Sequence, residues 1–382
     1  MTEKKKNAVF LYSPQFDNYH YPPDCPFNVS RAGKTYALVK SLGLVDTSAV
    51  KATTIAPADK ATMTKFHTEH YLDVLKNAAA GRQHPDAIDM GLGTGDCPIF
   101  EDMYDYSVLA CGATVTGAQM ILSGKADVVF NPSGGLHHAG PENASGFCYI
   151  NDPAIGCILL AEKQKRVLYL DIDVHHGDGV EKAFRDRNDV MTISFHQSGR
   201  TLFPGTGFED DIGTGPGKGY CVNIPLPPGT YDQAYMKAFN EIARPLIYAY
   251  DPDVFVLEFG ADTLIGDPLA QLDLTNNVYA NVIQFLTSTG KPILMTGGGG
   301  YNIENTVRAW ALGWTVLAGL EQDSDITAGM GGVMLGTNEW QGGLRDRELV
   351  IPDQQRDIVD PGVETTIRAV KDNVFGIHGL DK

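Results

Sequence analysis

Short apolar runs alternate along the chain with longer segments in which apolar and polar residues are mixed. Four of the runs are typical of buried parallel strands, because nearly all of their side chains are apolar. They lie at residues 126–130, 166–170, 254–257 and 292–295. The longer segments predict helices at residues 105–123, 152–163, 231–248, 276–288 and 303–317. This alternation favours an α/β fold, a single-domain three-layer α/β/α structure with a mostly parallel central sheet.

The length of 382 residues fits one large α/β domain or two ordinary ones. The sequence contains no proline- or serine-rich linker, no charged linker and no repeat. We therefore expect one domain over residues 1–382, with the catalytic motifs between residues 130 and 305. The 42 glycines and 21 prolines favour long loops at one end of the sheet, where sites are usually built.

The formal net charge of −17 opposes direct nucleic-acid binding, which needs basic patches that displace counterions. It is compatible with a cationic substrate such as a lysine-rich peptide. The sequence shows no signal peptide, and no run approaches the roughly 18 apolar residues of a membrane span. The six cysteines form no C-x-x-C pair, which is typical of buried thiols in a reduced, cytoplasmic protein.

Ionisable residues gather directly after the second predicted strand. Asp171, Asp173 and His175 follow the run at 166–170, and alternation along a strand places them on one face. In open α/β sheets, ligands bind at the carboxyl ends of the strands. Two carboxylates and an imidazole would repel and desolvate one another there unless a cation lay among them. The sequence therefore indicates a metal site rather than a solvated acidic turn.

The other three predicted strands are also followed by residues that are common in active sites. The adjacent His137 and His138 lie on a loop after the first strand, and Asp262 follows the third. The fourth strand leads into four glycines, which let the backbone approach a ligand closely, and then into Tyr301. Each feature alone is a weak signal, but four such strand ends in one chain indicate an active site.

A series of motifs runs in order from about residue 8 to about residue 320. The motifs lie at residues 135–141, 144–152, 171–179, 203–207, 260–262, 266–268 and 297–302, with 26–28 and Arg31 nearer the start. In this series the sequence resembles the histone deacetylase superfamily, which has the arginase/deacetylase fold. Within that superfamily it looks like the bacterial acetoin-utilisation proteins, which are similar to class I histone deacetylases. Residues 320–382 match less distinctly.

The resemblance implies a metal-dependent hydrolase in which Asp173, His175 and Asp262 bind the metal ion. One nitrogen and two carboxylate donors leave a coordination position open, as in catalytic sites. Such ligands suit zinc and also ferrous iron, so both are candidates. The related arginases bind two manganese ions through further carboxylates. The corresponding positions here are Leu264 and Gly177, which predicts a mononuclear site.

By the same resemblance, His137 and His138 are the proton-transfer pair, and Asp171 and Asp178 are their respective hydrogen-bond partners. His138 is expected to take a proton from the attacking water and to pass one to the leaving amine, while His137 assists electrostatically. Tyr301 is expected to donate a hydrogen bond to the developing oxyanion. The alternative for the histidines is a loop that is hydrogen-bonded to itself, and the alternative for the tyrosine is simple packing.

The resemblance also implies a narrow channel for an acylated lysine side chain. The residues implied in substrate binding are Asp96, Gly146, Phe147, Phe203, Leu269 and Arg31. Phe147 and Phe203 match the aromatic walls, and Asp96 matches a rim residue that binds the substrate backbone. Leu269 stands where polyamine deacetylases have glutamate, which argues against a polyamine substrate. Arg31 matches a buried arginine behind the metal that handles acetate.

Two structural potassium ions are implied as well. The first matches the side chains of Asp171 and Ser194 and the main-chain carbonyls of Asp173, His175 and Phe195. The second matches the main-chain carbonyls of Phe184, Arg187, Val190 and Tyr220. Glu258 departs from the pattern, because the family commonly has glutamine or a small polar residue at this position. A buried glutamate there needs a cationic or hydrogen-bonding partner, or an upward-shifted pKa.

The sequence thus predicts a zinc-dependent lysine deacetylase, which removes acetyl or other acyl groups from the N-ε-amine of lysine in proteins. Two alternatives stay open: a small-molecule amidase such as an acetylpolyamine deacetylase, and a non-catalytic acyl-lysine binder. The expected partner is an acyl-lysine protein or peptide, with no nucleic acid and no membrane. The sequence does not identify the physiological substrate, the acyl-chain preference or the oligomeric state.

Overall fold

The computed structural model describes residues 6–46, 53–163, 165–320 and 344–381. Within these residues, seven parallel strands form one sheet in the order β1-β2-β7-β6-β3-β4-β5. The strands are β1 (Ala8–Phe10), β2 (Val128–Asn131), β3 (Val167–Asp171), β4 (Val190–Gln197), β5 (Cys221–Leu226), β6 (Val254–Glu258) and β7 (Ile293–Thr296). All residues of β2 to β7 are buried, which explains why most of these strands are continuous apolar runs.

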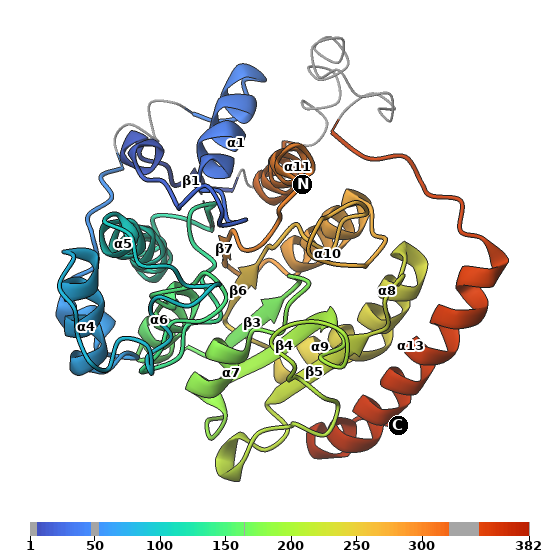
Figure 1. Ribbon diagram of the computed structural model, residues 1–382. Coiled ribbons are helices and arrows are strands. Elements are labelled where there is room, and N and C mark those ends of the chain that lie inside the picture. The colour runs from blue at the N-terminus through green and yellow to red at the C-terminus, as the bar shows by residue number, and fades with distance from the viewer. Residues whose placement is uncertain (1–5, 47–52, 164, 321–343, 382) are drawn as a thin grey trace.

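Helices cover both faces of the sheet (Figure 1). One layer contains α3 (Lys60–Met63), α4 (Glu69–Ala79), α5 (Met103–Leu122), α6 (Asp152–Ala161) and α7 (Asp178–Phe184). The other contains α1 (Ser30–Ser41), α8 (Asp232–Ala238), η3 (Phe239–Ala243), α9 (Arg244–Tyr250), α10 (Asn276–Ser288), α11 (Ile303–Ala318) and α13 (Asp353–Val374). Short 3-10 turns are η1 (Pro14–Asn18), η2 (Gly215–Gly217) and η5 (Phe375–His378). The predicted three-layer α/β/α fold is therefore confirmed.

Strand β3 contributes to the hydrophobic clusters on both sides of the sheet. Leu170, Ile172 and Val174 lie in the cluster formed with α10 and α11, whereas Tyr169 lies in the cluster formed with α5 and α6. This alternation continues past Asp171, although β3 ends at that residue. The polar residues between the three aliphatic ones are thus directed to the opposite side, as the sequence predicts.

The four predicted strands and four of the five predicted helices lie within two residues of their expected bounds. The helix predicted at 231–248 is instead divided into α8, the π-helical segment η3 and α9. Pro245 lies in the first turn of α9 and has no N–H to donate to the preceding turn. The π-helical turn before it accommodates this missing hydrogen bond.

Side-chain caps fix the starts of four helices around the site. In each case the side chain of the residue before the helix accepts a backbone N–H of the first turn, which satisfies a donor that the helix leaves unpaired. The capping residues are Thr68 for α4, Asn151 for α6, Thr275 for α10 and Asn302 for α11.

Because all described strands run in the same direction, their carboxyl ends lie along one edge of the sheet. The neighbouring strands β2, β7, β6 and β3 are followed there by the loops that carry the predicted site residues. All six cysteines are free thiols, and only Cys25 is not fully buried. No helix in the described ranges is both long and apolar enough to cross a membrane. Residues 321–343 of the predicted domain lie outside the described residues.

Candidate active site

Asp173, His175 and Asp262 lie together at the carboxyl edge of the sheet. Ligand atoms of the three side chains are all within 4.8 Å of one another, and all three residues are buried. Nδ1 of His175 is 3.1 Å from Oδ1 of Asp173 and 3.1 Å from Oδ2 of Asp262. One imidazole nitrogen thus faces two carboxylates, but it carries at most one proton and can donate a well-aligned hydrogen bond to only one of them.

The carboxylate oxygens of this group are held by the backbone, with one exception. Asp173 accepts the N–H of His175 through Oδ1 (2.8 Å) and that of Gly299 through Oδ2 (2.6 Å). Asp262 accepts the N–H of Val174 through Oδ1 (2.8 Å). Oδ2 of Asp262 is buried and has no hydrogen-bond partner among the described residues. A divalent cation among these donors would satisfy that oxygen and replace the shared proton, so the residues fit a metal ion.

Glycines make room for the two carboxylates. A Cβ atom at Gly260 would lie 1.9 Å from Oδ2 of Asp173, and one at Gly299 would lie 1.9 Å from Oδ2 of Asp262. Any side chain at either position would therefore displace a proposed ligand. In the loop after β7, glycine is required because the backbone lies so close to the carboxylate of Asp262.

In the metal-free group, burial and the neighbouring charges shift the pKa values of His175 and Asp262. Burial lowers the pKa of His175, but the two carboxylates outweigh it and raise that pKa to about 10. Burial and the charge of Asp173 raise the pKa of Asp262 to about 7. The group thus holds protons that a metal ion would displace, so its metal affinity should rise with pH.

His137 and His138 form a pair next to this group. Nδ1 of His137 is 2.9 Å from Oδ2 of Asp171, and Nδ1 of His138 is 2.9 Å from Oδ1 of Asp178. Their Nε2 atoms are 3.1 Å apart. Each Nδ1 carries a proton for its carboxylate, and the Nε2 contact requires one more. The two rings therefore share three protons, which makes one ring a cation and leaves the other neutral.

His137 is the cationic ring of the pair. Burial lowers the pKa of His137, but Asp171 and Asp173 outweigh it and hold that pKa well above its ordinary value. Burial and the charge of His137 together lower the pKa of His138 to about 4. At neutral pH, Nε2 of His138 is therefore the unprotonated nitrogen of the pair, as a general base requires.

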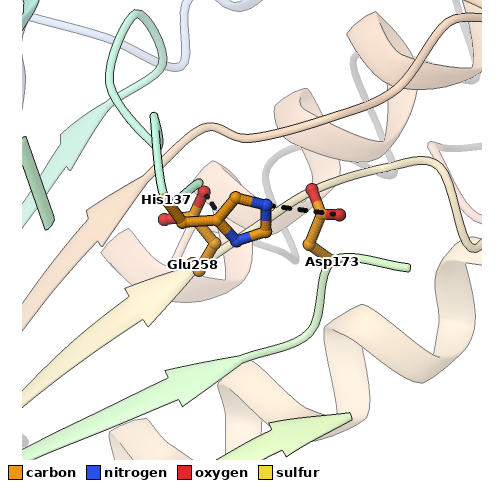
Figure 2. A group of neighbouring side chains, drawn as sticks. All are labelled: His137, Asp173 and Glu258. Atoms are coloured by element: carbon orange, nitrogen blue, oxygen red, sulfur yellow. Dashed lines mark ion pairs between the residues drawn. The ribbon is translucent and has the colours of Figure 1, made fainter. Parts of the chain in front are cut away.

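Figure 2 shows the ring of His137 between the carboxylates of Asp173 and Glu258. Its Nε2 is 3.9 Å from Oδ1 of Asp173, and its Nδ1 is 4.0 Å from Oε1 of Glu258. The donor atoms of these three residues also lie within 4.8 Å of one another. However, Nδ1 is bonded to Asp171 and the ring itself occupies the space between the carboxylates. The imidazolium balances these charges.

Glu258 is fully buried at the end of β6. Its Oε2 accepts a hydrogen bond from the hydroxyl of Thr296 (2.7 Å), whereas Oε1 has no hydrogen-bond partner within the described ranges. Burial raises the pKa of Glu258 well above its usual value; the charge of His137 opposes this effect and that of Asp171 adds to it. Glu258 therefore has both a hydrogen-bonding partner, Thr296, and a raised pKa, which are the features expected of a buried glutamate.

Replacing Glu258 with glutamine is expected to stabilise the folded protein by an amount that grows with pH. A raised carboxyl pKa contributes stability below the unfolded pKa of about 4.5, and this is lost as pH rises toward the folded pKa. The difference in the free energy of unfolding should widen by up to about 1.4 kcal/mol per pH unit. Urea unfolding at several pH values between about 5 and 8 measures it. The exposed Glu142→Gln is the control, and a difference independent of pH would contradict the assignment.

Phe203 and Tyr301 lie next to His175, Phe147 lies next to Tyr301, and Gly146 lies next to His138. The ring centroid of Phe203 is 5.0 Å from that of His138, and that of Tyr301 is 5.8 Å from Phe147. Both Phe203 (6.3 Å) and Tyr301 (6.4 Å) contact the ring of His175. Phe203 is 43% exposed, so this aromatic group extends from the buried site to the surface. A Cβ atom at Gly146 would lie 2.4 Å from Cδ2 of His138.

Arg31 contacts the glycine-rich loop, and Leu269 follows Asp267, which binds the N–H of Tyr301 at the end of that loop. Arg31, on α1, is buried and donates to the carbonyl of Gly300 (2.8 Å), and its guanidinium lies 4.6 Å from the ring centroid of Phe27. Leu269 is half-buried, and its N–H is bound by Oδ1 of Asp267 (2.9 Å). Asp96 lies on a different loop and binds the backbone of Gly146 (2.8 Å).

The residues matched to potassium lie on β3, β4 and the segments beside them. Asp171 and Ser194 are register partners on β3 and β4, and the Ser194 hydroxyl bonds Nδ1 of His196 at 2.9 Å. The carbonyls of Phe184 and Tyr220 each accept a backbone N–H and keep a second lone pair. Phe184 ends α7 and Val190 begins β4, with Arg187 between them. Both potassium sites stay predictions.

Sequence reasoning assigned no role to three residues that hold the site loops. The buried carboxylate of Asp152 accepts the N–H groups of Gly135 (3.0 Å) and Leu136 (2.9 Å), just before the histidine pair. Oδ2 of Asp267 accepts the N–H of Tyr301 (2.7 Å). The hydroxyl of Tyr169 donates to Oδ2 of Asp171 (2.7 Å). These residues lie inside or beside the recognised motifs, and that position was the only sign in the sequence that they hold the site.

Comparison with known proteins agrees with this fold and site. The structure is similar to the crystal structure of an HDAC homologue from Aquifex aeolicus, with a TM-score of 0.81 and 30% sequence identity over 95% of this chain and 100% of that one. The arrangement thus defines an α/β protein of the deacetylase class. The model of the histone deacetylase domain matches residues 25–317. The chain belongs to the histone deacetylase family, as its motifs predicted.

Eukaryotic family members are similar over most of the chain. Histone deacetylase RPD3 of Saccharomyces cerevisiae is 39% identical over 329 residues, which cover 84% of this chain and 74% of that protein. Histone deacetylase 8 of Danio rerio is 38% identical over 313 residues, which cover 80% of each. The chain spans between 61% and 80% of the length of these and other curated relatives.

Proposed function

We propose that this chain is a metal-dependent lysine deacetylase that hydrolyses the acyl amide of N-ε-acyl-lysine in proteins. The observation that supports this best is that a neutral imidazole, His138, contacts a cationic imidazole, His137, beside a group of three side chains that could hold a metal ion. One carboxylate oxygen of that group has no hydrogen-bond partner among the described residues. Asp173, His175 and Asp262 would hold the metal ion. Zinc is the proposed ion, and ferrous iron suits the same donors. When bound, it polarises the acyl carbonyl and favours ionisation of water.

The chain's own residues move the protons. Nε2 of His138 accepts a proton from the water that attacks the acyl carbon. Both imidazoles of the pair are then cations with Nε2 atoms 3.1 Å apart, and their repulsion makes protonated His138 a stronger acid than an isolated imidazolium. It gives that proton to the lysine nitrogen as the C–N bond breaks. Amide and water thus become a carboxylic acid and a free amine, with no other reactant.

Five further side chains act on the substrate or the product in this proposal. Burial and the nearby charges of Asp262 and Asp173 raise the pKa of Tyr301, so the phenol keeps its proton and can donate a hydrogen bond to the oxyanion. Phe147 and Phe203 would hold the methylene chain of lysine, and Leu269 would form the apolar rim. Arg31 would bind the acetate product. The cytoplasmic location and the bacterial branch stay predictions.

Purified protein should release acetate from an acetyl-lysine peptide, with a higher kcat/KM than for acetylated spermidine or putrescine. The apolar rim at Leu269 offers no carboxylate to the second amine of a polyamine, so a charged terminal amine loses hydration without compensation. Initial rates on both substrate classes test this. Preference for acetylpolyamines would make the protein a small-molecule amidase. Absence of turnover on both, with retained peptide binding, would make it an acyl-lysine binder.

A further inference from the structure

The turn that carries Phe147 has an unusual backbone. Ser145 and Cys148 exchange two hydrogen bonds (3.1 and 2.9 Å), which closes a two-residue turn with Gly146 and Phe147 at its tip. The φ angles of these tip residues are 53° and 65°. A turn with two left-handed central residues normally takes glycine or asparagine. Phenylalanine in this region is an outlier, so surrounding contacts must hold it there.

Asp96 binds both N–H groups at the tip of this turn. Its Oδ2 accepts the N–H of Gly146 (2.8 Å), and its main-chain carbonyl accepts the N–H of Phe147 (3.2 Å). Asp96 is itself held, because the hydroxyl of Thr94 donates to its Oδ1 (2.8 Å) and the same hydroxyl accepts the N–H of Cys97 (3.2 Å). One residue therefore fixes two consecutive amides whose conformation is otherwise unfavourable.

The carbonyl groups of the tip are bound as well. The Cys148 thiol donates to the carbonyl of Gly146 (3.2 Å), and the hydroxyl of Tyr21 donates to that of Phe147 (2.9 Å). The tip is thus held through all of its backbone polar groups. Of these groups, only the Gly146 N–H depends on a carboxylate, and charged acceptors form stronger hydrogen bonds than neutral ones.

The position of this turn determines the space next to the proposed base. A Cβ atom at Gly146 would lie 2.4 Å from Cδ2 of His138 and 3.0 Å from Cε1 of Phe203. Phe147 in turn contacts the ring of Tyr301, with centroids 5.8 Å apart. A small shift of the turn would therefore change the gap between the two aromatic walls and the contact with Tyr301.

We propose that Asp96 is a positioning residue that locks the turn 145–148 and so places Phe147 and the gap beside His138. This inference rests on the proposed function and adds to the expected role of Asp96 as a partner of the substrate backbone. A carboxylate has about four acceptor positions, so holding the turn leaves room for a substrate amide. The two roles differ in which substrates they affect.

The test uses an acetyl-lysine peptide and N-butylacetamide, which has the acylated alkyl chain but lacks the peptide backbone. Asp96→Ala should lower kcat/KM on N-butylacetamide by a factor of about 10–100, because a hydrogen bond to a charged group is lost, and it should lower kcat/KM on the peptide by at least as much. Asp96→Asn keeps an acceptor oxygen and should retain most activity on N-butylacetamide. Asp89→Ala removes an exposed charge from the same loop and should change neither. Loss on the peptide alone would overturn the proposal.

A second measurement does not depend on turnover. Amide hydrogen exchange of residues 145–148 in the substrate-free protein should be faster in Asp96→Ala than in the wild type, and it should be near the wild-type rate in Asp96→Asn. Unchanged exchange in a folded Asp96→Ala would overturn the positioning role. If the wild type hydrolyses neither substrate, the proposed function fails, whereas faster exchange in the variant would still support the lock.

Discussion

Removing the metal ion is expected to abolish amide hydrolysis, and Asp262→Ala is expected to have nearly the same effect. Asp262 is a proposed ligand, and it supplies a buried carboxylate oxygen that has no hydrogen-bond partner within the described residues. Treatment with a chelator should reduce turnover of an acetyl-lysine peptide to background, and zinc, iron(II) or cobalt(II) should restore it. Elemental analysis should find far less bound metal in the variant than in the wild type.

Asp262→Asn separates loss of the ligand from loss of the fold. Asparagine can still accept the N–H of Val174 and removes only the charge. In the metal-free protein, burial and the charge of Asp173 raise the pKa of Asp262 to about 7, so the fold loses stability as pH rises from the ordinary pKa of this carboxyl to about 7. The metal-free variant should therefore unfold at an equal or higher temperature than the metal-free wild type. Metal-free wild type that hydrolyses the peptide at the full rate would exclude a metal-dependent mechanism.

The sequence predicted the strands β2, β3, β6 and β7 that carry the site better than it predicted strand β4. Strands β2, β3, β6 and β7 are short apolar runs, and their pattern reflects burial on both faces. Strand β4 is equally buried but contains Thr192, Ser194 and His196, so its sequence does not read as an apolar run. The expectation for its side chains came only from the family motif.

The C-terminal helix α13 escaped prediction for a local reason. Pro361 and Gly362 lie near its middle, and this dipeptide normally indicates a turn. The helix nevertheless continues through them, because its apolar face packs against β5 and α8. A Cβ atom at residue 362 would lie 3.0 Å from Pro227, so glycine permits the close approach of the helix to that loop. Tertiary contacts outweighed local propensity here.

The proposed ligands and their neighbours on one strand were easier to find than the residues that hold the surrounding loops. Asp171, Asp173 and His175 share one side because alternation fixes their directions. The contacts of Asp96, Asp152 and Asp267 are made to backbone N–H groups of distant loops. Loop conformation has no period along the sequence, so these contacts follow only from the folded structure. That Oε1 of Glu258 has no hydrogen-bond partner among the described residues also follows only from the folded structure.

Substitutions of Tyr301 and His138 are expected to separate oxyanion stabilisation from proton transfer. Tyr301→Phe removes one hydroxyl, and losing one oxyanion donor typically costs about 10²–10³ in kcat. The KM value should change little, because the ground-state carbonyl carries less charge than the transition state. His138→Ala removes the general base and should cost about 10²–10⁴. Its pH–rate profile should also lose the fall at low pH that protonation of His138 produces.

Both variants should stay folded and keep their metal, because neither side chain belongs to the proposed ligand group of Asp173, His175 and Asp262. Steady-state kinetics, thermal unfolding and metal content on the same preparations test these expectations together. Loss of metal in His138→Ala would identify that histidine as a ligand rather than a base. Near-normal kcat in Tyr301→Phe would show that the oxyanion needs no donor from the tyrosine, and the phenol would then serve only to pack against Phe147.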